Sequence, residues 1–134
     1  MRIAIDFDGT IVEHRYPSIG KEKPFAVATI KQLVNDGHRI ILWTVRSGEL
    51  LEEAVKWCED RGIRLYAVNS NHPEGYMFSS AKGDSPKVDA DIFIDDANLG
   101  GLPDWGDIYE MINGKAQSRA RRKKKQSWLS KFLK

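Results

Sequence analysis

Apolar residues occur along this chain in two patterns. Short runs that are apolar at nearly every position predict buried strands, at residues 2–7, 38–43, 64–68 and 91–94. Segments in which apolar residues recur every three or four positions predict helices, over residues 24–37, 47–62 and 104–112. Strands that alternate with helices indicate right-handed crossovers between parallel strands. The pattern therefore predicts an α/β domain built on a parallel sheet.

The predicted fold is a three-layer, Rossmann-like sheet with the first strand central and no large cap domain. We expect the strands in the spatial order 3-2-1-4, so the direction of winding reverses beside the first strand. Ligands of such sheets bind beyond the carboxyl ends of the strands, at the point of reversal. Four acidic residues follow the first and fourth strands at this point: Asp6, Asp8, Asp95 and Asp96.

Charged residues divide the chain into two parts. Residues 1–113 hold 12 basic and 19 acidic residues, a formal charge of −7, whereas residues 114–134 hold nine basic residues and no acid. A chain of 134 residues has room for one domain with a core of its own. We therefore expect one folded domain over residues 1–113 and a separate basic tail over residues 114–134. The negative body argues against nucleic-acid binding by the body alone.

The tail combines a cationic run with apolar residues. Basic residues crowd positions 119–125 and precede four apolar residues that are expected on one side of a helix: Trp128, Leu129, Phe132 and Leu133. This pattern is typical of a segment that lies on an anionic membrane surface. The same run also suits an acidic protein partner, nucleic acid, or a solvated and disordered end.

The composition favours a cytoplasmic protein. No apolar run is long enough to cross a membrane, and the first residues begin a strand without the pattern of a signal peptide. The single cysteine, Cys58, cannot form an internal disulfide, which agrees with a reducing compartment. Because Cys58 falls on the apolar side of a predicted helix, we expect a buried thiol and not a nucleophile.

Residues 6–10, with the sequence DFDGT, contain the first candidate chemistry. Asp6 is expected to end the first strand, and Asp8 to lie in the turn that follows. Asp and Gly are also common in ordinary turns, so this motif alone is only moderately specific. Together with residues 95–96, however, it brings four carboxylates to one edge, where their repulsion calls for a cation. Oxygen ligands without a cluster of His or Cys favour Mg²⁺.

These residues resemble, in order and spacing, the four motifs of the haloacid dehalogenase-like superfamily of phosphohydrolases. The first motif, an apolar strand ending in Asp-x-Asp-Gly-Thr, matches residues 6–10. The second, a strand ending in Thr or Ser, matches Thr44. The third, a Lys before the fourth strand, matches Lys87, and the fourth, an acidic pair, matches residues 95–96. The resemblance covers the body of the chain but not the tail.

The resemblance implies a Mg²⁺-dependent phosphatase that hydrolyses a phosphate monoester through an aspartyl phosphate. Asp6 would be the nucleophile, and Asp8 would act first as general acid and then as general base. Thr44 would hydrogen-bond a phosphoryl oxygen, and Lys87 would neutralise charge on Asp6 and the phosphate. The presence of Asp8 favours ester hydrolysis over dehalogenation, since dehalogenases of the family lack an acid there.

The resemblance also implies binding roles. Thr10 and Arg46 are candidates for contact with the substrate phosphate, although a solvated arginine at a helix start is an equal alternative for Arg46. The expected metal ligands are Asp6, Asp8, Asp95 and Asp96. Of these, Asp8 would bind the metal through its backbone carbonyl.

Some assignments stay open at this point. Lys82 rivals Lys87 as the motif lysine, and either residue of the pair 95–96 suits the metal. The fourth motif often carries a further acid, and Asn98 stands near that place.

The short intervals between motifs predict an open site. Such a site suits a large substrate, namely a phosphoprotein, a nucleic-acid end or a polymer-linked sugar phosphate. The alternative is that a second subunit covers the site. Two alternative functions remain: a catalytically idle fold that binds a phosphorylated ligand or a protein partner, and a phosphatase that acts on nucleic-acid termini with help from the tail.

Overall fold

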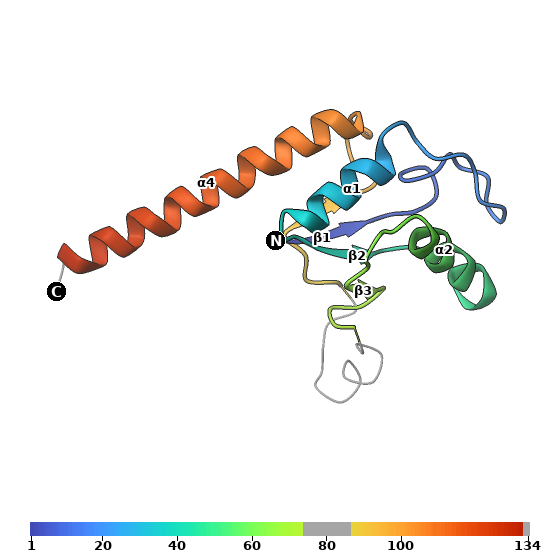
Figure 1. The fold of residues 1–134 in the computed structure, drawn as a ribbon, viewed down its shortest axis with the longest axis horizontal. Coiled ribbons are helices and arrows are strands. Elements are labelled where there is room, and N and C mark those ends of the chain that lie inside the picture. Colours follow the sequence, from blue (N-terminus) through green and yellow to red (C-terminus); the bar gives the residue numbers. More distant parts are fainter. Residues whose placement is uncertain (74–86, 133–134) are drawn as a thin grey trace. The chain divides into compact units, whose positions relative to one another are not determined.

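The computed structural model describes residues 1–73 and 87–132 of the chain (Figure 1). The helices and strands follow one another in the order β1 (Arg2–Ile5), α1 (Ala26–Asn35), β2 (Arg39–Leu42), α2 (Gly48–Asp60), β3 (Ala67–Val68), β4 (Ile92–Ile94) and α4 (Trp105–Phe132). Contacts within the chain define two compact units, Met1–Leu102 and Pro103–Lys134. The first unit contains the sheet and the predicted site residues, and the second contains α4.

The four strands form one parallel sheet in the order β3-β2-β1-β4. β1 has a hydrogen-bonded neighbour on each side, with Ile5 in register with Leu42 of β2 and with Ile94 of β4. The prediction of an α/β chain with a parallel sheet is confirmed, and the strand order is the one expected from the sequence. The carboxyl ends of β1 and β4 consequently lie next to each other.

One face of the sheet is covered by the first two helices. The side chains of Ile3, Ile5, Ile40 and Leu42 alternate to this face and are at most 1% exposed. Trp57 of α2 meets the ring of Phe7 edge-on, with the ring centroids 5.6 Å apart. Right-handed crossovers explain this arrangement, because two steps in the same direction along a sheet place both helices on one face.

On the opposite face, Val88 from the described residues before β4 packs against the sheet. Ala4, Ile41 and Ala67 of three neighbouring strands form a buried cluster with Val88. Trp43 and Phe93 pack at the edge of this cluster. Each strand is therefore apolar on both sides, which explains why the strands appear in the sequence as continuous apolar runs.

Cys58 of α2 is fully buried, as the sequence predicts for a structural thiol. Burial raises the pKa of this thiol to about 12, so the reactive thiolate is not populated near neutral pH.

The last helix differs from its prediction. The sequence suggested an end near residue 112, but α4 continues through Gly114 to Phe132. A mid-helix glycine costs only about 1 kcal/mol relative to alanine, and the following residues are mainly Arg, Lys, Gln and Ala, which are good helix formers. The prediction that the helix ends at residue 112 is therefore wrong.

Neither α4 nor any other helix within residues 1–73 and 87–132 combines the length and apolar character needed to cross a membrane.

Candidate functional site

Three carboxylates meet where β1 and β4 end. Asp6 directly follows β1, and its backbone N–H donates a 2.9 Å hydrogen bond to the carbonyl of Ile94 in β4. Asp95 and Asp96 follow β4. One oxygen from each of these three aspartates lies within 4.8 Å of the other two. Three of the four acids that the sequence singled out are therefore close enough to share one cation, whereas the side chain of Asp8 is engaged elsewhere.

Thr10 links the carboxylates of the two strands. Its side chain is fully buried, and its hydroxyl lies 2.9 Å from an oxygen of Asp6 and 3.2 Å from an oxygen of Asp96. The same hydroxyl accepts a hydrogen bond from the backbone N–H of Asp96 at 3.0 Å. Thr10 was expected to contact the substrate phosphate, but in the structure its hydroxyl positions Asp6 and Asp96 relative to each other.

Gly9 allows this close approach. Its φ of +84° lies in the left-handed region that favours glycine. A Cβ atom at this position would also overlap the carboxylate of Asp96. The glycine of the motif is thus needed for two separate reasons, the backbone conformation and the space for an acidic side chain.

Crowding changes the acidity of the cluster. Burial raises the pKa of Asp6 to about 7, and a hydrogen bond with Asp96 and the nearby charge of Asp95 act in the same direction. Burial acts to raise the pKa of Asp96 as well. Hydrogen bonds with Asp6, Asp95 and Thr10 outweigh this effect and hold the pKa of Asp96 below its usual range. Asp6 is therefore only partly ionised near neutral pH unless a cation compensates its charge.

Asp8 is held by a buried arginine. Arg46 Nε lies 2.7 Å from one carboxylate oxygen of Asp8, and Nη2 lies 2.8 Å from the other. Asp8 is 8% exposed and Arg46 is 1% exposed. A two-pronged contact of this kind fixes both the position and the plane of the carboxylate.

The remaining hydrogen-bond donors of Arg46 are also used. Nη1 donates to the carbonyls of Pro17 and Leu50 at 3.1 and 3.4 Å, and Nη2 donates to the carbonyl of Ser18 at 3.0 Å. All five N–H groups of the guanidinium thus have an acceptor. Arg46 was expected either to bind the substrate anion or to be solvated. The structure places it in neither position, because it is buried and its donors serve Asp8 and the chain.

Aromatic rings complete the surroundings of Arg46. The guanidinium carbon lies 5.4 Å from the ring centroid of Phe7 and 5.2 Å from that of Tyr16. Arg46 thereby connects the turn after β1, the loop at residues 16–18 and the start of α2. We assign it the role of positioning Asp8.

Thr44 lies just past the end of β2. Its backbone N–H donates to the side-chain oxygen of Asn69 at 2.8 Å, and its hydroxyl accepts the backbone N–H of Arg46 at 3.2 Å. Asn69 follows β3 with a positive φ of 52°. Asn69 was not among the residues predicted from the sequence, although an Asn at the carboxyl end of a predicted strand is a usable signal because Asn tolerates this conformation.

Lys87 lies beside the last strand. Its ammonium nitrogen is 6.0 Å from the ring centroid of Phe93, the β4 residue in register with Ala4. The rival lysine, Lys82, lies outside the described residues. Asn98 donates from its side-chain amide to the carbonyl of Phe93 at 3.3 Å, so in this structure it braces the turn after β4.

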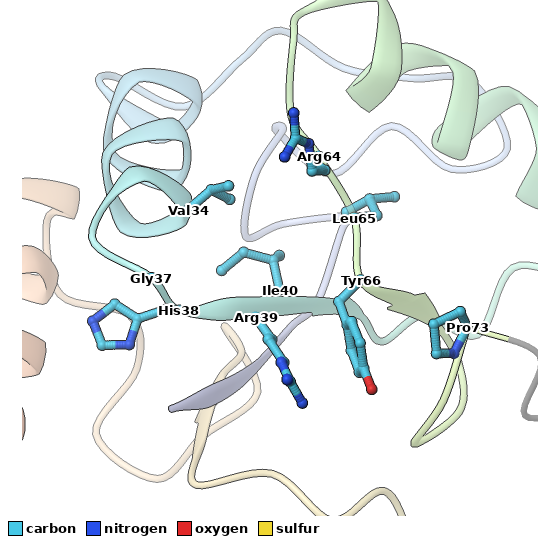
Figure 2. Close-up of a pocket in the computed structure, with 9 residues that line it drawn as sticks. All are labelled: Val34, Gly37, His38, Arg39, Ile40, Arg64, Leu65, Tyr66 and Pro73. Atoms are coloured by element: carbon cyan, nitrogen blue, oxygen red, sulfur yellow. The ribbon is translucent and has the colours of Figure 1, made fainter.

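A cavity of about 450 Å³ lies at the opposite edge of the sheet, near the amino ends of β2 and β3 (Figure 2). None of the described site residues lines it. Figure 2 shows Arg39 and Tyr66 extending to the same side of β2, while Arg64 points away. The guanidinium carbon of Arg39 lies 4.9 Å from the ring centroid of Tyr66. The basic groups around this cavity do not converge on one point, and we assign it no ligand.

Comparison with a solved structure establishes the family. A structure described as that of a conserved protein from Bacteroides thetaiotaomicron matches this chain with a TM-score of 0.80 and 60% sequence identity. The match covers 86% of this chain and 91% of the other. This chain belongs to the family of that Bacteroides protein. No protein-family model and no curated protein matches the chain.

The acidic cluster predicts a pH-dependent response to Mg²⁺. The folded-state pKa of Asp6, about 7, lies above its ordinary value of 3.8. Without metal, the protonated carboxyl therefore contributes stability that is present at acidic pH and is lost as pH rises towards 7. We expect Mg²⁺ to raise the unfolding temperature more at pH 8 than at pH 5.5, because the metal competes with the proton on Asp6.

Thermal unfolding of the intact chain and of Asp6→Asn, each with and without Mg²⁺, measures this effect. The variant should lose the pH-dependent part of the response. An equal response of the intact chain at both pH values would contradict a metal site that includes Asp6. Asp60→Asn, on the exposed side of α2, serves as the control.

The buried ion pair predicts a large loss of stability in Arg46→Met. This substitution leaves the carboxylate of Asp8 buried without a partner, which typically costs about 3–5 kcal/mol in the free energy of unfolding. The matched control is Lys56→Met, because Lys56 forms an exposed ion pair with Asp60 at 2.9 Å, and such pairs contribute at most about 1 kcal/mol. Urea denaturation compares the two. Equal losses would show that Asp8 does not depend on Arg46.

Proposed function

We propose that this chain is a Mg²⁺-dependent phosphohydrolase of the haloacid dehalogenase-like type, with the layers of that fold arranged around β1. The observation that carries this proposal is the group formed by Asp6, Asp95 and Asp96 at the carboxyl edge of a parallel sheet. Ligands of such sheets bind at this edge. The turn that places Asp6 there is the motif at residues 6–10 from which the resemblance starts.

The donor set suits Mg²⁺. Three carboxylates supply hard oxygen ligands and leave room for water and a phosphate oxygen, as Mg²⁺ prefers. A raised pKa, as at Asp6, is expected of a carboxylate whose negative charge lacks a compensating cation. Asp6, Asp96 and Asp95 would hold the ion together with the backbone carbonyl of Asp8. When bound, the ion would offset the repulsion between the nucleophile and the phosphate.

Asp6 is the proposed nucleophile. A carboxylate oxygen would form a bond to phosphorus as the bond between phosphorus and the leaving oxygen breaks. Water would then attack the phosphorus of the aspartyl phosphate, releasing inorganic phosphate and restoring the carboxylate. The contact with Thr10 supports this role, because it fixes one oxygen of Asp6 and leaves the carboxylate oriented. Thr44 and Lys87 would bind the phosphoryl oxygens.

Asp8 is proposed as the proton donor to the leaving group, and its contact with Arg46 limits that role. Both oxygens of Asp8 accept hydrogen bonds from the guanidinium. A carboxyl oxygen that carries a proton accepts hydrogen bonds from a guanidinium less strongly than a carboxylate oxygen does, so this contact opposes general acid catalysis by Asp8. The reaction should therefore favour leaving groups that depart without a proton, such as phenolates, carboxylates and phosphates.

A second candidate function rests on the same contact. If Asp8 never leaves Arg46, the site binds a phosphorylated ligand beside Asp6 without turning over an ester that needs acid catalysis. The catalytically idle fold is therefore retained as the alternative.

The proposal predicts how phosphate release varies between substrates. With Mg²⁺ present, kcat/KM for a nitrophenyl phosphate should exceed that for an alkyl phosphate of similar size by about tenfold or more, equivalent to ~1.4 kcal/mol in the barrier. EDTA should abolish release. Asp6→Asn should do the same without changing the unfolding temperature by more than a few degrees.

Three outcomes decide between the candidates. Release that needs both Mg²⁺ and Asp6 supports the phosphohydrolase. Release that survives Asp6→Asn would refute the assignment of the nucleophile. Binding of a phosphate ester in the presence of Mg²⁺, with no release from any substrate, would favour the idle fold.

A further inference from the structure

The part of α4 beyond its third turn is mostly exposed and strongly basic. Trp105, Ile108 and Ile112 are buried, at most 5% exposed, whereas every described residue from 121 to 132 is exposed. No acidic residue follows Glu110 in the sequence. This part of the helix carries eight described basic residues, namely Lys115, Arg119, Arg121, Arg122, Lys123, Lys124, Lys125 and Lys131.

The end of the helix presents large apolar side chains to solvent. Trp128 is 57% exposed, Leu129 38% and Phe132 71%. Trp128 and Phe132 are four residues apart, and their ring centroids lie 4.6 Å from each other. Exposed apolar groups that gather in one place usually mark a surface of interaction.

Basic and apolar residues lie on the same side of the helix but at different positions along its axis. Arg121, Lys125, Trp128 and Phe132 are spaced by four, three and four residues, which places them in one row. This row extends over about 16 Å at 1.5 Å per residue. Its first half is cationic and its second half is aromatic.

We propose that residues 119–132 of α4 dock on an anionic lipid surface. The apolar end would enter the boundary between headgroups and acyl chains, while the cationic half would remain at the level of the phosphates. Lys131, close to the apolar end, can extend its charge to the headgroups along its flexible stem. Docking needs both the apolar end and the cationic half, because either one alone gives weak and reversible attachment to a membrane.

The shape of the apolar group favours lipid over nucleic acid. Proteins that bind single strands offer separate aromatic rings on which successive bases stack. Here the two rings contact each other, and the aliphatic Leu129 stands beside them. Among the described residues, the exposed apolar group at the end of α4 occupies one turn, which is too short for the row of anchors with which a helix fills a groove in a protein partner.

Sedimentation of the intact chain with lipid vesicles tests the proposal. Vesicles of phosphatidylcholine alone should retain little protein. Vesicles that also contain phosphatidylglycerol should retain it at low ionic strength and release it at high ionic strength. The double substitution Trp128→Ser with Phe132→Ser should weaken retention by about tenfold or more. Arg121→Gln with Lys125→Gln should weaken it as well.

Matched substitutions in the first unit serve as controls. Phe25 is 74% exposed, so Phe25→Ser removes an exposed aromatic ring without touching α4. Lys56→Gln removes an exposed cation from α2. Both variants should sediment like the intact chain. Circular dichroism of each variant checks that the helix content is unchanged.

Depth of insertion provides an independent readout. Phosphatidylcholine with brominated acyl chains, mixed with phosphatidylglycerol, should quench part of the tryptophan fluorescence in the intact chain but not in Trp128→Phe. Failure to sediment with anionic vesicles would overturn the proposal, as would sedimentation that survives loss of both rings. Displacement from the vesicles by single-stranded RNA at equal phosphate concentration would assign the surface to nucleic acid instead.

Discussion

Repulsion between carboxylates at one edge of the sheet is the constraint on which the site depends. β1 and β4 are parallel neighbours, so Asp6 emerges beside Asp95 and Asp96 within 4.8 Å. Thr10 hydrogen-bonds across this group, and Gly9 provides the space for it. Asp8, two residues after Asp6, escapes the repulsion by pairing with Arg46. The result is one acid compensated by the chain and three that are close enough to share a cation.

The sequence predicted the sheet and the acidic edge because both depend on local patterns. β1 and β2 are buried on two faces and therefore appear as unbroken apolar runs, and parallel strands bring their carboxyl ends to one edge. The positions of Asp6 and residues 95–96 follow directly from these rules. The bounds of the strands were predicted less accurately, since the run at residues 64–68 forms only the short strand Ala67–Val68.

The contacts that the sequence did not reveal join residues far apart in the chain. Asp8 and Arg46 are separated by 38 positions, and Thr44 and Asn69 by 25. Arg46 follows a strand and precedes a helix, a place where a solvated side chain is as common as a buried one. Only the fold brings it under Tyr16 and between two loops. The extent of α4 was missed for a different reason, because Gly114 resembled a helix stop but stands in a segment of strong helix formers.

In the proposed reaction, Asp6 accepts a phosphoryl group with the help of Mg²⁺. Beryllium fluoride imitates a phosphoryl group on a carboxylate, so ¹⁹F NMR of the chain with this reagent tests the claim without any knowledge of the substrate. We expect a bound signal that requires Mg²⁺, persists in Asp60→Asn and disappears in Asp6→Asn. A bound signal that survives Asp6→Asn, or no bound signal in the intact chain with Mg²⁺, would contradict it.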